Sequence, residues 1–343
     1  MDKDKGKQKI SLVVTTIASS KHPILKKFAK ISLKENINFV IIGDKKSPSK
    51  FSLKGANYFS LQKQKSLKFK LSKILPINHY SRKNLGYLIA MLKNPETIVE
   101  TDDDNIPLKN FFSKNSLNKQ KTFVSKNAGW VNVYRFFTKQ YIWPRGFALE
   151  ELQAPLTKKF KLSKVVSPIK QGLADKNPDV DAIYRLTCKL PITFNSSKNI
   201  SLGSGSICPF NSQNTSWLRE AYPLMYLPSY CSFRMTDIWR SFIAQRVAWT
   251  CGWSVLFHSS TVIQERNEHN LMKNFKDEIS GYENNFMIMK NLIKLKLKPG
   301  IKNIKHNMIL CYKEFIYMKL IDEKEMKLLN AWFLDLEQIL KNN

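Results

Sequence analysis

Three consecutive carboxylates, Asp102, Asp103 and Asp104, follow a short apolar run in the stretch TIVETDDDNIP, residues 97–107. Adjacent carboxylates raise one another's pKa and destabilise a fold unless positive charge compensates them. Side chains alternate along an extended chain, so Asp102 and Asp104 point to one side and Asp103 to the other. A solvated turn that caps a helix is the competing interpretation. The position after a buried strand favours a site where Asp102 and Asp104 bind Mn²⁺ or Mg²⁺.

The elements that must position these acids are predicted from hydrophobic periodicity. Residues 10–17, 37–42 and 97–99 are β-branched and apolar, as in strands buried on both faces, and residues 21–35 and 80–92 carry helix-spaced apolar side chains. Alternating strands and helices predict an α/β fold with a mostly parallel central sheet. Ligands bind at the carboxyl ends of such strands. Thr15, Thr16 and Asp44 should therefore lie beside the triple aspartate.

Composition narrows the class of protein. The chain has 343 residues, 43% apolar and 12% aromatic, which is ordinary for a globular protein. It contains no apolar run near the ~20 residues that span a bilayer, and its first residues lack the apolar stretch of a signal peptide. The five cysteines are widely spaced and fit neither a zinc cage nor a disulfide framework. We expect a cytoplasmic protein with free thiols.

The net charge of +29 is unevenly distributed, because residues 1–83 contain 20 Lys/Arg against four acids. Such a surface attracts nucleic acid, anionic lipid or phosphorylated ligands, or is simply a solvated lysine face. Lysines heavily outnumber arginines, whereas specific base and phosphate recognition favours arginine. We therefore expect no nucleic-acid partner, and we expect peripheral contact with the inner membrane face through lysines.

The position of the triple aspartate discriminates between two metal-dependent classes. Phosphatases of the haloacid-dehalogenase type place D-x-D after the first strand, whereas here the acids follow about a hundred residues of α/β chain. Glycosyltransferases with the GT-A fold place D-x-D after the nucleotide-binding half of the sheet. The position favours the transferase.

Longer stretches carry a more specific resemblance. VVTTIASS, FVIIGDKKSP, RKNLGYLIAM, ETDDDNIP, GWVNVYRFFTKQYIWPRGFAL, QGLADKNPDVDAIYRLT and QERNEHNLMKNF occur in this order. Over roughly residues 10–280 the chain resembles the STELLO-type family of glycosyltransferases, and its triple aspartate looks like that of UDP-arabinopyranose mutases. The resemblance implies a GT-A-like fold and a nucleoside-diphosphate sugar donor, most simply a UDP-sugar. Plant members carry an N-terminal membrane anchor, which we do not expect here.

The resemblance also implies roles for individual residues. Asp102 and Asp104 would bind the metal and the diphosphate, and Asp103 would touch the ribose or the sugar. Thr15, Thr16 and Asp44 match positions that hold the base and ribose, and donor contacts are expected of Lys83 and Asn84. These assignments form the donor half of the predicted site.

A second group of residues is expected on the acceptor side. Asp179 and Asp181 lie in a turn-prone loop and either bind sugar hydroxyls or cap a helix. Asp237 opens a predicted helix, where it is either the general base that deprotonates the acceptor or a plain N-cap. Arg234 and Arg240 are expected to offset the charge of the departing diphosphate.

The resemblance to GT-A enzymes implies a third metal ligand, often a histidine from a late strand. His258 follows the apolar run at residues 253–257, and His269 in QERNEHN is its rival. A lone histidine is also common as a structural residue. Trp143 is a further candidate, for stacking on a sugar face.

The predicted organisation is a GT-A-like catalytic domain over residues 1–265 with a helical extension over 266–343 packed on it. The predicted function is metal-dependent transfer of a sugar to a glycan or lipid-linked acceptor in cell-surface polysaccharide synthesis. Two alternatives remain open: a nucleotide-sugar mutase, and a non-catalytic scaffold of a polysaccharide pathway.

Overall fold

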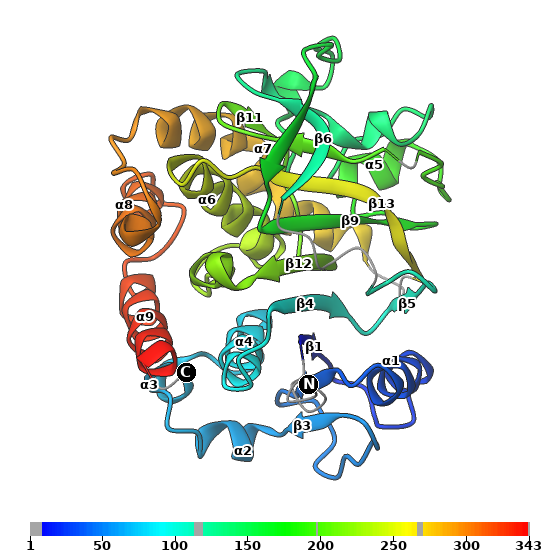
Figure 1. The fold of residues 1–343 in the computed structure, drawn as a ribbon, viewed down its shortest axis with the longest axis vertical. Coiled ribbons are helices and arrows are strands. Elements are labelled where there is room, and N and C mark those ends of the chain that lie inside the picture. Colours follow the sequence, from blue (N-terminus) through cyan, green and yellow to red (C-terminus); the bar gives the residue numbers. More distant parts are fainter. Residues whose placement is uncertain (1–8, 113–118, 197, 266–269, 342–343) are drawn as a thin grey trace, which may run out of the picture.

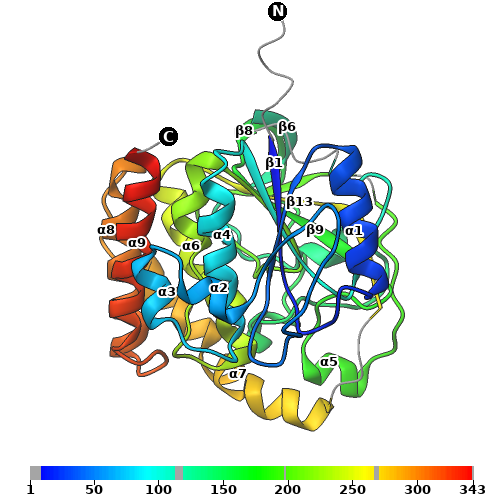
Figure 2. The same cartoon turned by 90° about the horizontal axis from the view of Figure 1, so that it is seen from below.

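The computed structural model describes residues 9–112, 119–196, 198–265 and 270–341. A central sheet runs through the molecule and helices cover both of its faces (Figure 1, Figure 2). The predicted α/β class, with a sheet flanked by helices and a helical C-terminal region, is confirmed. His269 lies outside the described residues.

The strands of the central sheet lie in the order β3-β2-β1-β4-β12-β9-β13-β10-β6-β8, and β5 pairs with β13. Their bounds are β1 Ile10–Thr15, β2 Asn38–Ile42, β3 Asn57–Phe59, β4 Thr97–Asp102, β5 Asn105–Pro107, β6 Lys119–Ser125, β8 Lys161–Val166, β9 Ile169–Asp175, β10 Ile200–Leu202, β12 Asn214–Leu218 and β13 Val255–Gln264. Strands β7 (Gly129–Trp130) and β11 (Ser206–Ile207) form a separate pair.

The α-helices are α1 Pro23–Lys34, α2 Leu61–Lys65, α3 Lys70–Ile74, α4 Lys83–Met91, α5 Ala182–Thr187, α6 Thr236–Thr250, α7 Leu271–Lys294, α8 Ile304–Tyr317 and α9 Glu325–Lys341. Short 3₁₀ helices include η1 (Tyr80–Arg82) and η5 (Phe233–Met235). In Figure 2, α1 lies on one side of the sheet, and α4, α6, α8 and α9 lie on the other.

The alternation of side chains in β1 divides the interior into two cores. Leu12 and Val14 belong to the smaller core with Phe28 of α1, whereas Val13 belongs to the larger core with Leu85 of α4. Because successive side chains of a strand point to opposite faces, β1 needs apolar residues at every position. This explains why the strand reads as a continuous apolar run instead of an alternating one.

The N-terminal strands β3, β2, β1 and β4 are all parallel, whereas beyond β4 the sheet mixes both directions. The predicted mostly parallel sheet is therefore correct only for the N-terminal strands. Thr15 is in register with Ile42 of β2 and with Asp102 of β4. The carboxyl ends of three adjacent strands therefore meet at one edge of the sheet. The polar residues that follow these strands are brought together there, as the sequence predicts.

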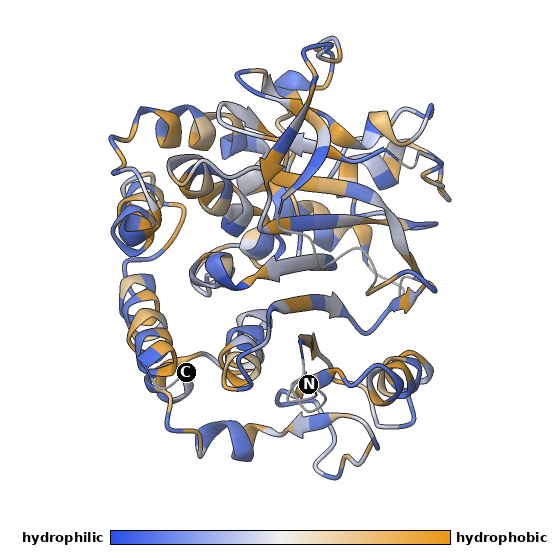
Figure 3. Cartoon of the chain, viewed as in Figure 1, coloured by the Kyte–Doolittle hydropathy of each residue, from blue (hydrophilic) through white to orange (hydrophobic). Residues whose placement is uncertain are grey.

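The C-terminal helices share the larger core with the sheet. Phe315 of α8 and Trp332 of α9 are buried in the same cluster as Val13 and Leu85. Helices α1 and α9 both carry hydrophobic and hydrophilic residues along their length (Figure 3), as expected of helices with one buried face. The predicted division at residue 265 stays a prediction.

Candidate donor-binding site

A pocket of about 690 Å³ opens at the carboxyl ends of β1, β2 and β4. It brings together nine of the predicted site residues: Thr15, Thr16, Asp44, Asp102, Asp103, Asp104, Asp179, Arg234 and Asp237. It is also lined by residues that the sequence analysis did not select: Ile17, Ala18, His22, Ile42, Gly43, Lys46, Asn78, His79, Tyr80, Arg82, Arg145, Gln213, Phe233 and Gln264. Residues more than 200 positions apart thus converge on one cavity.

The triple aspartate lies between two strands. Strand β4 ends at Asp102, a tight turn contains Asp103 and Asp104, and β5 then pairs with β13 through Asn105 and Gln264. Asp103 accepts a hydrogen bond from the hydroxyl of Thr16, which comes from the end of β1. Asp104 Oδ2 accepts one from Gln264 Nε2 at 3.0 Å. Pairing on both sides therefore fixes the turn and holds the acids at the pocket wall.

Among the described residues, Asp102 is the one of the three acids that has a cationic neighbour. Lys83 Nζ lies 2.8 Å from Asp102 Oδ1, and the lysine side chain is fully buried whereas that of Asp102 is 34% exposed. The same Nζ donates to the carbonyl of Ser212 at 3.3 Å. Lys83 thus contacts Asp102 instead of lining the pocket, and its predicted direct contact with a donor is corrected to a role behind the carboxylate.

Asp104 is short of positive charge. Burial, together with the carboxylates of Asp102 and Asp103, raises its pKa to about 7, against the hydrogen bond from Gln264. Its Oδ1 atom is buried and has no hydrogen-bond partner among the described residues, and the same is true of Gln264 Oε1. Burial also raises the pKa of Asp102, which Lys83 opposes. Two buried oxygens without a hydrogen-bond partner among the described residues, one of them on an acid with a raised pKa, are suited to bind a cation.

The protein side chains at this site do not by themselves complete the coordination shell of a metal ion. No three His, Cys, Asp or Glu side chains within residues 9–112, 119–196, 198–265 and 270–341 form a group that could hold an ion alone. Mg²⁺ and Mn²⁺ commonly use one or two carboxylates and complete their shell with water and substrate phosphates. The residues present fit an ion of that kind, and they do not fit a closed, all-protein cage.

Asp44 organises the opposite wall. Its Oδ1 accepts the backbone N–H of Asn78 at 2.7 Å, and its Oδ2 accepts that of His79 at 2.8 Å. The carboxylate thereby fastens the segment before η1 to the end of β2. Burial lowers the pKa of His79, and Asp44 opposes that shift. Asp44 lines the pocket, but both of its oxygens already bind the backbone.

Arg145 is the central residue of the remaining wall, and the sequence analysis missed it. Its Nε and Nη2 bind Asp179 at 2.8 and 2.9 Å, and Nη1 and Nη2 bind Asp237 at 3.0–3.1 Å. Its Nη1 also donates to the carbonyl of Arg234. The guanidinium is the main cause that lowers the pKa of Asp179 to about 2, against burial. Arg145 therefore neutralises two carboxylates at once.

These contacts do not support the predicted general base. Asp237 does stand at the start of α6, but its side chain caps no N–H of that helix and is bound by Arg145 and by the Ser212 amide at 3.3 Å. Each carboxylate oxygen of Asp237 already accepts two hydrogen bonds from the protein. Asp237 instead forms, with Asp179, an ion-paired wall of the pocket.

Two arginines expected to face a diphosphate have other partners. Arg234 lines the pocket but pairs with buried Glu278 at 2.8 Å. Arg240 is buried and pairs with Glu100 at 2.9 Å, beneath the pocket in the core. The role predicted for Arg240 is therefore wrong, and Arg234 is held by Glu278.

Three more predicted site residues lie outside the lining of the pocket. Asn84 is buried and binds the backbone of Leu227. Asp181 caps α5 and accepts the indole N–H of Trp143 at 2.6 Å, which makes both residues structural. His258 is 3% exposed within β13, with Nδ1 2.8 Å from the carbonyl of Ser259. None of the three reaches the triple aspartate's pocket.

Several aromatic residues close the pocket on the η1 side. Phe233 is 53% exposed and lies edge-on to His79 and Tyr80, at centroid distances of 5.7 and 6.2 Å. The sequence analysis selected Arg234, the neighbour of Phe233 in the chain, and missed Phe233 itself. An exposed ring at the mouth of a polar pocket offers an apolar surface to a ligand.

Comparisons with known proteins bear on the sequence resemblance. The family model of STELLO glycosyltransferases matches residues 234–341. From *Arabidopsis thaliana*, "Probable glycosyltransferase STELLO2" is 28% identical over 269 residues, covering 72% of this chain and 35% of the relative. "Probable glycosyltransferase STELLO1" is 29% identical over 241 residues, covering 64% and 31%.

The chain thus spans about a third of the length of these curated relatives. The "Crystal Structure of a Mycobacterial Protein" aligns with 80% of this chain and 75% of that chain, at a TM-score of 0.40 and 10% identity. The resemblance to the STELLO family is confirmed by the family model and the two relatives. The likeness of the triple aspartate to that of the mutases stays a prediction.

Proposed function

From its kinship with the STELLO glycosyltransferases, we propose that this chain is a metal-dependent glycosyltransferase that takes its sugar from a nucleoside-diphosphate sugar, most simply a UDP-sugar. The observation that carries the proposal is the charge balance of the pocket. Within the described part of the chain, a single cation, Lys83, pairs with the three acids, through Asp102, while Asp104 keeps a buried oxygen that has no partner there. A divalent ion would supply the missing positive charge and would also bind the diphosphate of the donor.

Each wall of the pocket has a distinct part in this proposal. Asp102 and Asp104 would hold the ion, and Thr15, Thr16 and Asp103 would bind the ribose or the sugar. The ion supplies Lewis-acid stabilisation of the leaving diphosphate when it is bound. Arg82 contributes a donor, since its buried Nη2 has no partner among the described residues. This donor suits an oxygen of the nucleotide.

The ion-paired wall would serve the acceptor. Asp179 and Asp237 are fixed by Arg145, and Asp179 Oδ1, which accepts one hydrogen bond from Arg145, can also accept a hydrogen bond from a sugar hydroxyl. Phe233 lies at the mouth on the same side as Arg234. An acceptor glycan, or a lipid-linked glycan of cell-surface polysaccharide synthesis, would enter there. We assign no general base.

Membrane contact is part of the proposal for a lipid-linked acceptor. Within the described residues, no helix is long and apolar enough to cross a bilayer. Contact would then be electrostatic, through exposed lysines and anionic lipid headgroups. The lysine-rich N-terminal part of the chain supports this electrostatic contact.

Incubation with a panel of radiolabelled nucleoside-diphosphate sugars and Mn²⁺, with and without a glycan fraction, tests the reaction class. A transferase releases nucleoside diphosphate and labels the glycan. A mutase yields an isomer of the donor from the donor alone. A non-catalytic scaffold binds the nucleotide sugar but turns none over, so the transferase proposal would be lost.

A further inference from the structure

Two buried carboxylates of the C-terminal helix α9 bind backbone groups of two distant segments that lead to residues of the pocket lining. Asp335 is 1% exposed and Glu325 is 0% exposed. Buried carboxylates are costly unless their oxygens are fully hydrogen-bonded. Burial raises the pKa of both acids, and their hydrogen bonds oppose that shift. An acid at such a buried position is therefore expected to have a specific role.

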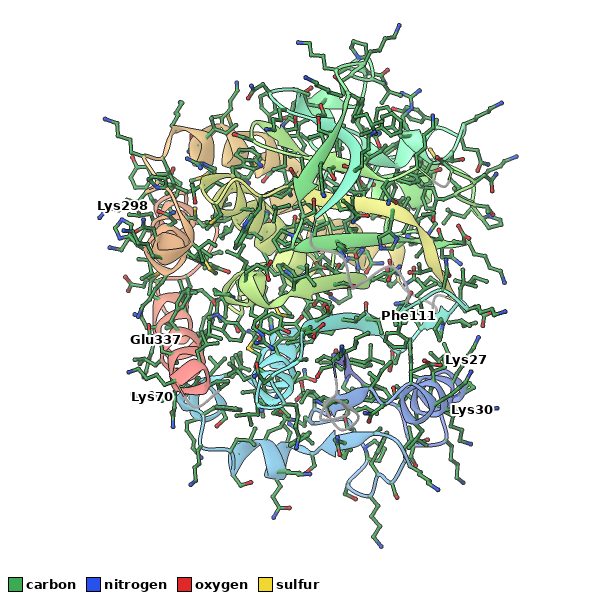
Figure 4. All side chains as sticks on the ribbon, viewed as in Figure 1. Lys27, Lys30, Lys70, Phe111, Lys298 and Glu337 are labelled. Carbon is green, nitrogen blue, oxygen red and sulfur yellow. The ribbon has the colours of Figure 1, made fainter. Side chains whose placement is uncertain are left out.

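Asp335 binds the segment that leads to η1. Its two oxygens accept the backbone N–H groups of Lys70 and Leu71 at 2.7 and 2.8 Å, in the first turn of α3. Figure 4 shows Lys70 beside α9. The end of α3 then receives Arg82, whose Nη1 donates to the carbonyls of Leu75 and Pro76 at 3.2 and 3.1 Å. Asp335 thus supports the chain that carries Asn78, His79, Tyr80 and Arg82 into the pocket.

Glu325 binds the segment that leads to η5. Its Oε2 accepts the backbone N–H groups of Ser229 and Tyr230 at 2.9 and 2.8 Å, and its Oε1 accepts the hydroxyl of Tyr226. Three residues later the chain reaches Phe233 and Arg234, which line the pocket.

The two supported segments also contact each other. The hydroxyls of Ser81 and Ser229 are 2.7 Å apart in the buried interior. The ring of Phe233 lies edge-on to those of His79 and Tyr80. One helix therefore holds both segments, and the segments are joined to each other where they form the pocket wall.

We propose that α9, through Glu325 and Asp335, positions the pocket wall formed by residues 78–82 and 229–234, so that the C-terminal helix is a support of the nucleotide site. Both acids are positioning residues, because neither lines the pocket. The inference rests on the proposed function for the identity of the ligand. The link between α9 and the two segments does not depend on that function.

Two variants test the link in the full chain. Asp335→Ala removes the acceptors for Lys70 and Leu71, and Glu325→Gln keeps the shape of the side chain while it removes the charge. Asn307→Ala is the matched control, because Asn307 is equally buried on α8 and holds the turn at Lys298 through two backbone hydrogen bonds, away from the pocket. All three should lower the unfolding temperature.

The decisive readouts are hydrogen exchange and affinity for UDP with Mn²⁺, measured where each variant is folded. In Asp335→Ala and Glu325→Gln, the amides of residues 78–82 and 229–234 should exchange faster, and the dissociation constant for UDP should rise about tenfold, as expected when a binding wall is displaced by a fraction of an ångström. Asn307→Ala should change neither quantity.

Unchanged exchange in both segments would overturn the inference, since α9 would then be a structural helix only. If exchange rises but UDP affinity stays at the wild-type value, the positioning role is equally lost. If the wild type binds no nucleoside diphosphate, the proposed function fails, and the exchange measurement still decides the link.

Discussion

At the scale of single residues, the site is defined by an imbalance of charge. Two acids of the pocket, Asp179 and Asp237, share the guanidinium of Arg145, and Asp102 is paired with Lys83. Asp104 accepts a hydrogen bond from the amide of Gln264 and pairs with no cation among the described residues. In a chain of net charge +29, a buried acid without a cationic partner in the described part of the chain is a specific feature of this site and does not follow from overall composition.

Replacing Asp104 with Asn should separate ligand binding from stability. Asn keeps the size of the side chain and an acceptor for Gln264, and it removes like-charge repulsion. We expect the free energy of unfolding in urea to stay the same or rise, and Mn²⁺-dependent UDP affinity to fall about 10–100-fold. Glu337→Gln, a change at an exposed acid paired with Lys305, should alter neither. A variant that binds UDP and Mn²⁺ normally would contradict the assignment of Asp104.

The same residue predicts a dependence on pH. The pKa of Asp104 is about 7 in the fold against 3.8 for the free group. Because the folded state holds the proton more tightly, this group destabilises the fold above pH 3.8, and stability is regained as pH falls from 7 towards 4. Mn²⁺ competes with that proton, so its affinity should fall up to about tenfold per pH unit below 7. Mn²⁺ titrations at pH 6, 7 and 8 measure this, and a flat profile would contradict it.

Sequence reasoning found the triple aspartate because its signal is local: three acids follow a buried strand. It missed Arg145, whose partners Asp179 and Asp237 are 34 and 92 residues away. It also selected His258, which lies in a strand whose register with β9 shifts between His258 and Val262. A periodic pattern cannot reveal which face of such a strand reaches a pocket.

At the scale of elements, the bridge formed by Arg145 joins the start of α6 to the loop that precedes α5. Removing one partner of a buried ion pair leaves the other charge uncompensated. Arg145→Ala leaves the buried carboxylates of both Asp179 and Asp237 without their guanidinium partner. The bridge is therefore expected to be important for stability as well as for the shape of the pocket.

We expect Arg145→Ala to lower the free energy of unfolding by about 3–5 kcal/mol, measured in urea at pH 7. Asp179→Asn added to that variant should restore part of the loss, because it removes one unpaired charge. In the wild type, the stability from Asp179 is present above pH 3.8 and is lost as pH falls towards its folded pKa of about 2. A wild-type-like Arg145→Ala protein would show that the bridge is not structural.

Helix positions were predictable where the buried face is apolar. Residues 21–35 gave α1 within two residues at its start and one at its end. Helix α7 begins at Leu271, but its first buried positions are the polar residues Asn274 and Glu278, so apolar periodicity does not reveal where it starts. The antiparallel insertion of β12 between β4 and β9 depends on pairing with β4, more than a hundred residues away, and with β9, more than forty residues away, and no local pattern encodes it.

At the scale of the whole molecule, positive charge is spread over exposed lysines. Lys26, Lys27 and Lys30 are exposed on α1, and Figure 4 shows Lys27 and Lys30 pointing away from the body of the protein. The loop that precedes α1 contributes Ile17 and His22 to the pocket. An anionic surface that binds this helix would therefore lie close to the pocket mouth.

We expect the protein to sediment with vesicles rich in anionic phospholipid at 50 mM NaCl and to be released at 500 mM, because salt screens exposed charges. Changing Lys26, Lys27 and Lys30 to Glu should abolish sedimentation. The same change at Lys296, Lys298 and Lys302, exposed on another part of the chain, should weaken it less. Equal loss in both variants would show that net charge alone governs binding.

The central claim is that a divalent ion allows the crowded acids at the end of β4 to bind a diphosphate, and calorimetric titration with UDP tests it most directly. We predict that UDP binds the wild type with Mn²⁺ present, that binding is lost with EDTA, and that uridine without phosphate binds weakly under both conditions. UDP binding of equal affinity with and without the ion, or the absence of any nucleoside-diphosphate binding, would contradict the account.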